Sequence, residues 1–104
     1  MTDKRIVLTT AGSADEARRI AEALVERKLA ACVNIVPKIA SIYRWKRKVE
    51  EAEEWLLVIK TGVAFEKVRD AIREMHSYEL PECLAIAIED GSPEYLKWLA
   101  ESSE

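Results

Sequence analysis

The hydrophobic pattern is most extended between residues 29 and 61, where two alternating arms flank a short polar turn near residues 45–50. At roughly 3.3 Å per residue, arms of about a dozen residues are longer than the usual strand of five or six. Pro37 interrupts the first arm and, having no N–H to donate, predicts a bulge or an edge position there. We therefore predict a long β-hairpin that projects from its own sheet and must pack against another surface.

Shorter patterns on both sides of this hairpin predict two more strands and three helices. The expected strands cover residues 6–10 and 83–89. Three separate stretches have apolar residues at helical spacing: one after Ser13, one from residue 65 to 75, and one after Ser92-Pro93. Ser13 and Glu16 fit a capping box, in which each side chain bonds a backbone N–H of the other residue. Residues 76–81 are expected to form a loop and residues 101–104 a polar tail.

The predicted order is strand, helix, strand, strand, helix, strand and a final helix. Two right-handed crossovers joined by a hairpin give an α+β, ferredoxin-like βαββαβ sandwich with both crossover helices on one face of an antiparallel sheet. The hairpin strands carry apolar residues on both faces, so the face without helices also needs a cover. Association with further copies of the same chain is the simplest cover, and the extended hairpin would clasp the neighbouring copy.

Length and composition indicate one globular domain over residues 1–104. The chain is 49% hydrophobic and 34% charged, with 16 basic and 19 acidic residues and a net charge of -3. This balance gives no electrostatic case for nucleic-acid binding. No stretch resembles a signal peptide or a membrane span. Cys32 and Cys83 form neither a CxxC pair nor a disulfide framework, which predicts a cytoplasmic protein with reduced thiols.

Six short segments form an ordered set of motifs over nearly the whole chain. They are Leu8–Thr10, Leu29–Asn34, Ser41–Trp45, Lys60–Thr61, His76–Glu82 and Tyr95–Leu99. In sequence and order these segments resemble the CutA divalent-cation tolerance family. The resemblance implies a single CutA-like domain and a homotrimer built like PII-type signalling proteins. It also implies a role in tolerance of copper and other divalent metals, with shared polar residues in clefts between subunits and no firmly attached catalysed reaction.

The chain departs from the family pattern at four positions. Arg47 stands in the hairpin turn where the family usually has Gly, which makes a tight turn less certain because Gly tolerates positive φ. Ser77 replaces a Pro, Cys83 an aliphatic residue, and Gly12 a common Pro. These departures suggest a hypothesis that the chain is an engineered variant kept for its trimeric scaffold. A full metal response in a cell lacking its own homologue would count against it.

Three residues are candidate metal ligands: Cys32, His76 and Glu79. From the residues alone, Cys32 is more simply a buried small hydrophobe, but the resemblance matches it to a cysteine implicated in copper binding, and a thiol suits Cu(I). His76 follows a helix C-terminus, where capping is the simpler role. One His and one Glu three residues apart form a weak site without another ligand source. Cys83 is close in sequence, although a core thiol is the simpler interpretation.

Four further residues are candidates for an intersubunit cleft. Lys60 ends a strand and is either solvated or a charge lining the cleft. Tyr43 and Trp45 are expected to pack on a neighbouring subunit, with ligand stacking as the alternative, and Tyr78 belongs to the His76–Glu82 motif. The acidic residues after the turn, Glu50, Glu51, Glu53 and Glu54, are expected to form a solvated edge. Such an edge would also collect hard cations loosely.

Enzyme signatures are missing from the sequence, and we predict that the protein is not an enzyme. The chain has three glycines and no phosphate-cradling glycine loop. Three interpretations remain open. The first is a trimeric divalent-cation (copper) binding protein without an obligatory cofactor. The second is a signalling or scaffold trimer that takes a small anion or a partner protein. The third is an enzyme that uses His76.

Overall fold

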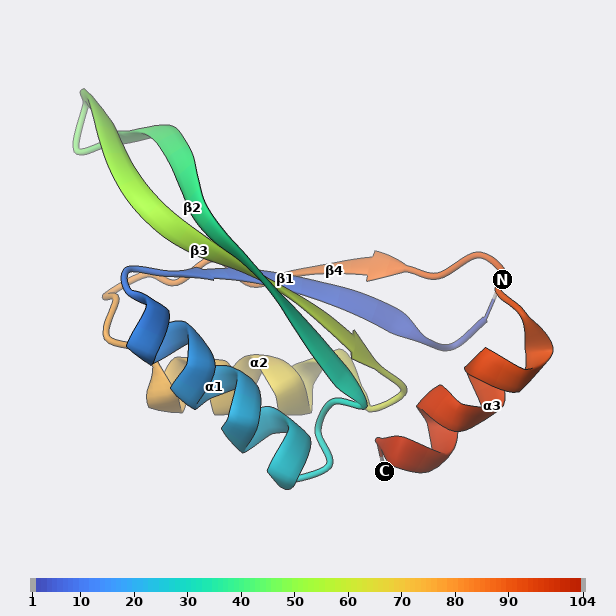
Figure 1. The fold of residues 1–104 in the computed structure, drawn as a ribbon. Coiled ribbons are helices and arrows are strands. Elements are labelled where there is room, and N and C mark those ends of the chain that lie inside the picture. Colours follow the sequence, from blue (N-terminus) through green and yellow to red (C-terminus); the bar gives the residue numbers. More distant parts are fainter. Residues whose placement is uncertain (1, 104) are drawn as a thin grey trace.

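The computed structural model describes residues 2–103 and contains four strands and three helices (Figure 1). The strands are β1 (Arg5–Ala11), β2 (Cys32–Trp45), β3 (Lys48–Thr61) and β4 (Leu84–Ala87), and the helices are α1 (Ala14–Glu26), α2 (Phe65–Met75) and α3 (Pro93–Ser102). The element order matches the order expected from the sequence. No helix in this range is both long and apolar enough to cross a bilayer.

The four strands form one antiparallel sheet in the order β2-β3-β1-β4. Helices α1 and α2 lie side by side beneath one face of this sheet, and α3 lies beyond the opposite end from the hairpin tip (Figure 1). Both crossovers therefore place a helix on the same face, which is the ferredoxin-like arrangement. The expected α+β fold class, with its extended hairpin and additional C-terminal helix, is confirmed.

Helices and sheet enclose a single hydrophobic core. Alternate residues of the central strands, including Val7, Leu57 and Ile59, point toward the helices and are fully buried. Helices α1 and α2 cover them with apolar residues spaced three and four positions apart. These residues are Ala17, Ile20, Ala21 and Leu24 of α1 and Val68, Ala71 and Ile72 of α2. The core is thus formed by one face of the sheet and one apolar stripe of each crossover helix.

The β2–β3 hairpin is the longest feature of the fold, with 14 residues in each strand. Its tip is a two-residue turn, in which Lys46 and Arg47 adopt positive φ values of 50° and 70°. The register shifts between Val36 and Ile39 as expected at Pro37, and β2 is an edge strand. The shift inserts one extra residue, so the side chains of β2 exchange faces there. Tyr43 and Trp45 consequently face the side of the sheet away from the helices.

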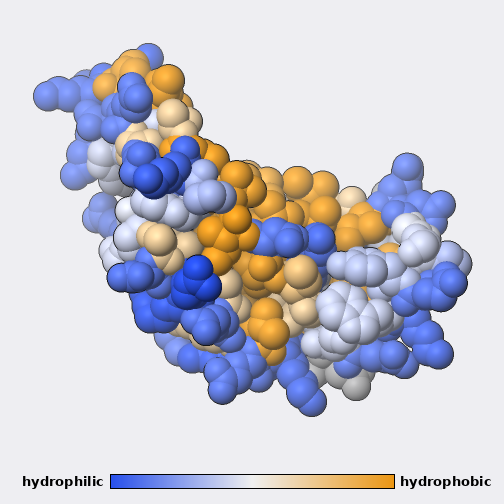
Figure 2. Space-filling model, viewed as in Figure 1, coloured by the Kyte–Doolittle hydropathy of each residue, from blue (hydrophilic) through white to orange (hydrophobic). Residues whose placement is uncertain are grey.

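That second side, which we call the open face, carries the alternate residues of all four strands. Ile6, Leu8, Leu56 and Val58 lie at its centre, paired through the strand register. Toward the edges Val36, Leu84 and Ile86 are 41%, 57% and 48% exposed. Figure 2 shows hydrophobic surface extending along the sheet from the base of the hairpin. The expected uncovered apolar face is therefore present in the single chain.

The C-terminal part differs from the expectation in three respects. Strand β4 is shorter than residues 83–89 and lies exposed along the sheet edge. In α3 only Leu99 is buried, while Tyr95 and Trp98 contact each other at the surface in a tilted arrangement, with ring centroids 5.4 Å apart. The prediction of a polar tail from residue 101 is wrong, because α3 continues to Ser102 and Ser103 is only 2% exposed.

Ser103 is buried because its hydroxyl links two elements. The hydroxyl donates to the Leu99 carbonyl oxygen at 2.6 Å and accepts the Gly62 N–H at 2.9 Å. The first bond completes the last turn of α3, and the second fastens that turn to the residue after β3. Two backbone groups that would otherwise be unpaired are satisfied, which explains why a serine near the C-terminus is enclosed.

Candidate functional site

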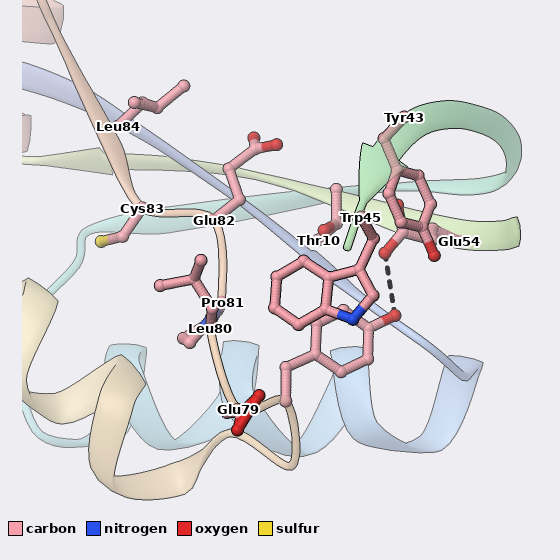
Figure 3. Close-up of a pocket in the computed structure, with 11 residues that line it drawn as sticks. Thr10, Tyr43, Trp45, Glu54, Glu79, Leu80, Pro81, Glu82, Cys83 and Leu84 are labelled. Atoms are coloured by element: carbon pink, nitrogen blue, oxygen red, sulfur yellow. Dashed lines mark hydrogen bonds between the residues drawn. The ribbon is translucent and has the colours of Figure 1, made fainter. Parts of the chain in front are cut away.

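A cleft of about 630 Å³ opens on the open-face side of the sheet, between the hairpin and the loop that joins α2 to β4 (Figure 3). We call it the aromatic cleft. Its lining residues are Thr10 of β1, Tyr43, Trp45 and Glu54 of the hairpin, and Tyr78, Glu79, Leu80, Pro81, Glu82, Cys83 and Leu84 of the loop and β4. Because the bulge near Pro37 turns Tyr43 and Trp45 to this side, the hairpin supplies one wall of the cleft.

Tyr78 is held in place from three directions. Its hydroxyl donates to Glu54 Oε2 at 2.8 Å, and its ring lies 4.6 Å from the His76 ring, centroid to centroid. A Cβ at Gly12 would come within 3.1 Å of the Tyr78 hydroxyl oxygen, so the absence of a side chain at Gly12 permits this position. Burial, followed by the hydrogen bond and charge of Glu54, raises the pKa of Tyr78 well above its usual range. The phenol therefore remains a hydrogen-bond donor at neutral pH.

His76 holds the loop against the end of β1. Its side chain is fully buried, Nε2 lies 2.6 Å from the Thr10 carbonyl oxygen, and Nδ1 accepts the Tyr78 N–H at 3.0 Å. This pattern assigns the proton to Nε2 in a neutral imidazole, with the lone pair of Nδ1 directed at a backbone N–H. A metal ligand needs a free lone pair. Because both ring nitrogens already make hydrogen bonds in this arrangement, His76 has none to offer a metal.

Glu16 fastens the same loop from α1. Ser13 caps α1 as expected by accepting the Glu16 N–H, but the Glu16 carboxylate reaches Ser77 rather than the N-cap. One carboxylate oxygen accepts the Ser77 N–H at 2.8 Å and the other accepts the Ser77 hydroxyl at 3.0 Å. Burial alone would raise the pKa of Glu16, but the bonds from Ser77 outweigh it and the pKa is lowered. The reciprocal half of the expected capping box is replaced by a contact between distant segments.

Cys32 lies away from His76 in the chain. It opens β2 on the open face, opposite Lys60, which in turn pairs with Ile6 of β1. His76 binds Thr10, four residues further along β1, which corresponds to roughly 13 Å along a strand. Within residues 2–103 no three His, Cys, Asp or Glu side chains are grouped to hold a metal ion. The single chain therefore does not unite Cys32, His76 and Glu79, and their joint ligation stays a prediction.

The remaining predicted site residues divide into two groups. Tyr43, Trp45 and Tyr78 meet in the aromatic cleft, and the exposed Glu79 also lines it. Lys60 does not line it and instead lies beside Cys32, with which it pairs across β2 and β3. Two carboxylates also line the cleft: the sequence placed Glu54 only in an acidic edge and Glu82 only at the end of a motif, and it predicted neither as a cleft residue.

Glu54 corrects the expectation of a solvated acidic edge, since it is only 8% exposed and receives the Tyr78 hydroxyl. Alternation along β3 places Glu54 on the same face as Leu56 and Val58, but no sequence signal predicts that Tyr78 meets it there. Cys83 also lines the cleft, and its partial burial raises the pKa of its thiol. A metal would therefore have to displace a proton that is held more tightly on Cys83 than on an exposed thiol.

Comparison with known families places almost the whole chain in one group. Residues 5–102 match the model of the CutA1 divalent ion tolerance protein family. The divalent-cation tolerance protein CutA of Thermus thermophilus is 48% identical over 101 residues, covering 96% of this chain and 98% of that protein. The CutA protein of Homo sapiens is 45% identical over 89 residues, and there the match covers 85% of this chain but only 50% of the human protein.

Solved structures agree with the sequence comparison. The Thermus thermophilus protein superimposes with a TM-score of 0.94 at 48% identity, covering 97% of this chain and 99% of that chain. The CutA structure from Archaeoglobus fulgidus, described as a periplasmic divalent cation tolerance protein, has a TM-score of 0.93 at 46% identity, covering 97% and 99%. The names of these relatives describe cation tolerance and not a catalysed reaction.

Proposed function

Because the chain belongs to the CutA1 divalent ion tolerance family, we propose that it acts as a homotrimeric divalent-cation tolerance protein that binds copper. The observation that carries this proposal is the family match over residues 5–102, combined with a free thiol at Cys32 that is only partly buried. A thiolate is a soft donor, and soft donors select Cu(I) over hard cations.

Cys32 is accessible enough to act as such a ligand. It stands on the edge strand β2, is partly exposed, and its S–H donates to the Asn34 side-chain oxygen at 3.9 Å. In this proposal Glu79 supplies an exposed carboxylate from another subunit. His76 joins only after its bonds to Thr10 and Tyr78 break, so its contribution to affinity is smaller than that of Cys32.

The trimer in this proposal is supported by the open face. A sheet covered by helices on one side, with Leu84 57% exposed on the other, leaves an apolar surface that association would bury. The long hairpin reaches beyond its own domain and offers an arm to a neighbour. Cys32 and Cys83 are both unpaired, which fits the reducing cytoplasm, where we place the protein.

Titration with Cu(I) under anaerobic conditions tests the ligand assignment. We expect wild-type protein and Cys83→Ala, the matched thiol control, to bind copper with equal stoichiometry, and Cys32→Ala to lose that binding. His76→Ala should weaken binding by a smaller factor than Cys32→Ala does. Unchanged stoichiometry and affinity in Cys32→Ala would overturn the assignment.

A second candidate is a non-catalytic signalling or scaffold trimer, natural or engineered, for which metal binding is incidental. The aromatic cleft favours it, because a cavity of this size is unnecessary for holding a single ion. Complementation separates the two candidates. In cells lacking their own homologue, growth on copper that the wild-type chain restores and Cys32→Ala does not supports the first candidate, and failure of the wild-type chain to restore growth supports the second.

A further inference from the structure

The end of the hairpin carries an exposed hydrophobic pair on the face turned away from the aromatic cleft. Ile42 and Val49 are 70% and 66% exposed, and they are diagonal neighbours across β2 and β3, because Val49 pairs with Arg44. Alternation along the strands puts these three residues on the opposite face from Tyr43 and Trp45. Figure 2 shows hydrophobic surface at the end of the arm as well as along the sheet. We call the face formed by Ile42, Arg44 and Val49 the tip surface.

Helix α3 carries a second exposed apolar surface. Tyr95 and Trp98 are each 43% exposed, and their rings contact each other with centroids 5.4 Å apart. Residues three and four positions apart are neighbours on a helix, so the exposed Glu94 and Glu101 both border Trp98. We call these four residues the α3 patch, which is an aromatic surface with a border of carboxylates.

The tip surface and the α3 patch have opposite charge. Residues 44–48 contain four basic residues and no acidic one, whereas residues 89–101 contain four acidic residues and one basic one. Within the described part of the chain, Arg44, Glu94 and Glu101 have no ion-pair partner. Two tips would repel each other, as would two α3 patches. Each surface is therefore complementary to the other and not to a second copy of itself.

The minority charge on each surface also has a counterpart on the other. Glu51 lies opposite Ile42 and so shares the face of the tip surface. Lys97 is the basic residue of α3, and it stands beside Trp98 in the sequence. A contact that joins the two surfaces would thus offer Lys97 to Glu51 while the more numerous charges attract one another.

The two surfaces cannot meet within one chain. The Cα atoms span 44 Å along the longest axis of the molecule, and the hairpin tip and α3 lie toward opposite ends of it (Figure 1). Complementary surfaces at the two ends of one chain form a head-to-tail contact between copies. Such contacts close into a ring when the rotation from one copy to the next allows it. A ring of three copies would use every tip and every α3 patch.

We propose that the hairpin tip of each copy docks on the α3 patch of the next copy. Ile42 and Val49 pack against the Tyr95–Trp98 pair, and Arg44 lies beside the carboxylates that border Trp98. Aromatic and arginine side chains of this kind contribute most to the stability of an interface. The inference rests on the proposed trimer, and it adds which surface of the neighbouring copy receives the arm.

Light scattering of the full-length protein over a dilution series tests the contact. Val49→Asp and Trp98→Asp each place a charge in it, from opposite sides, and each trimer should dissociate at a protein concentration at least about tenfold higher than that of the wild type. Val25→Asp changes a valine that is exposed on α1 and should have no effect. Subunit exchange between tagged and untagged protein gives the same comparison if the trimer resists dilution, and circular dichroism verifies that each variant folds.

An exchange of charges locates the contact. Arg44→Glu and Glu94→Arg each oppose like charges and should weaken the trimer several-fold, whereas the combined variant Arg44→Glu/Glu94→Arg should recover much of the loss. Arg18→Glu, an exposed basic residue of α1, should neither weaken the trimer nor be rescued by Glu94→Arg.

The outcomes separate this contact from the trimer itself. A wild type that stays a single subunit at micromolar concentration would overturn both proposals. A wild-type trimer whose stability is unchanged in Val49→Asp and in Trp98→Asp would overturn the docking of the tip on α3 and leave the trimer standing.

Discussion

Thr9 and Thr61 are both fully buried on the helix-facing side of the sheet, yet only the Thr61 hydroxyl makes hydrogen bonds among the residues described. The Thr61 hydroxyl donates to the Leu29 carbonyl oxygen at 2.7 Å and accepts the Val63 N–H at 2.9 Å. Thr9 Oγ1 is buried without a hydrogen-bond partner among the residues described. A buried polar atom that has lost water and gained no partner reduces the free energy of unfolding.

This contrast predicts opposite effects for the same substitution. Thr9→Val removes the unpaired hydroxyl at nearly constant volume and should raise the free energy of unfolding by about 1 kcal/mol. Thr61→Val removes two hydrogen bonds and should lower it by about 1–3 kcal/mol. Urea unfolding at a fixed protein concentration measures both, and a Thr9→Val variant less stable than wild type would contradict the account.

The Glu16–Ser77 contact predicts a pH dependence of stability. The pKa of Glu16 is lowered in the folded chain from a usual value of 4.5. A depressed carboxyl pKa contributes stability above the unfolded-state value, and this contribution disappears as the pH falls through the folded value. Glu16→Gln should therefore lower the free energy of unfolding at pH 7 by roughly 1–2 kcal/mol, and this difference should shrink below about pH 4.5.

Thermal unfolding of the wild type and Glu16→Gln between pH 7 and pH 3 measures this difference. Glu22→Gln, an exposed residue on the same helix, removes the same charge without removing a loop contact. We expect the Glu22→Gln variant to differ little from wild type at any pH. A constant gap between wild type and Glu16→Gln across the range would show that the carboxylate charge is not responsible.

At the scale of elements, the sequence predicts most of what local periodicity determines. The hairpin arms, the bulge at Pro37 and helix α2 follow from alternation, from a missing N–H and from helical spacing, each visible within a few residues. Contacts between distant segments are not visible in this way. The Tyr78–Glu54 and Ser77–Glu16 bonds join residues 24 and 61 positions apart. They depend on how the loop after α2 packs against α1 and β3, which no local sequence pattern predicts.

The hairpin tip is one place where the residue types do not match the backbone geometry. Lys46 and Arg47 both have positive φ, the geometry of a two-residue turn that favours Asn-Gly. A side chain in the left-handed region lowers the free energy of unfolding by roughly 1 kcal/mol. The long β2–β3 hydrogen-bond ladder offsets this cost. Arg47→Gly should therefore raise the free energy of unfolding by about 0.5–1 kcal/mol. Lys48→Gly, within β3, should lower it instead, and equal effects in a urea titration would refute the strain.

For the whole molecule, the two faces of the sheet have different roles. Helices α1 and α2 cover one face. The sequence predicts that the other face is apolar, because both alternating sets of hairpin residues are hydrophobic. The aromatic cleft begins where this open face meets the hairpin, so a residue of the open face can affect both assembly and the cleft. Assembly is best tested away from the cleft, at the centre of the sheet.

Val58 lies at that centre, with Asn34 and Leu8 as its neighbours across the strands. Its side chain points away from the helices, so Val58→Asp should leave the subunit core intact but place a charge in the proposed interface, which is costly without a partner. Light scattering of the wild type should give three times the subunit mass of 11.8 kDa, and the variant should shift toward one subunit. Val25→Asp, on the exposed side of α1, makes the same change and should leave the trimer unaltered. A wild-type mass of a single subunit at micromolar concentration would refute the trimer, and it would require the apolar open face to be covered in another way.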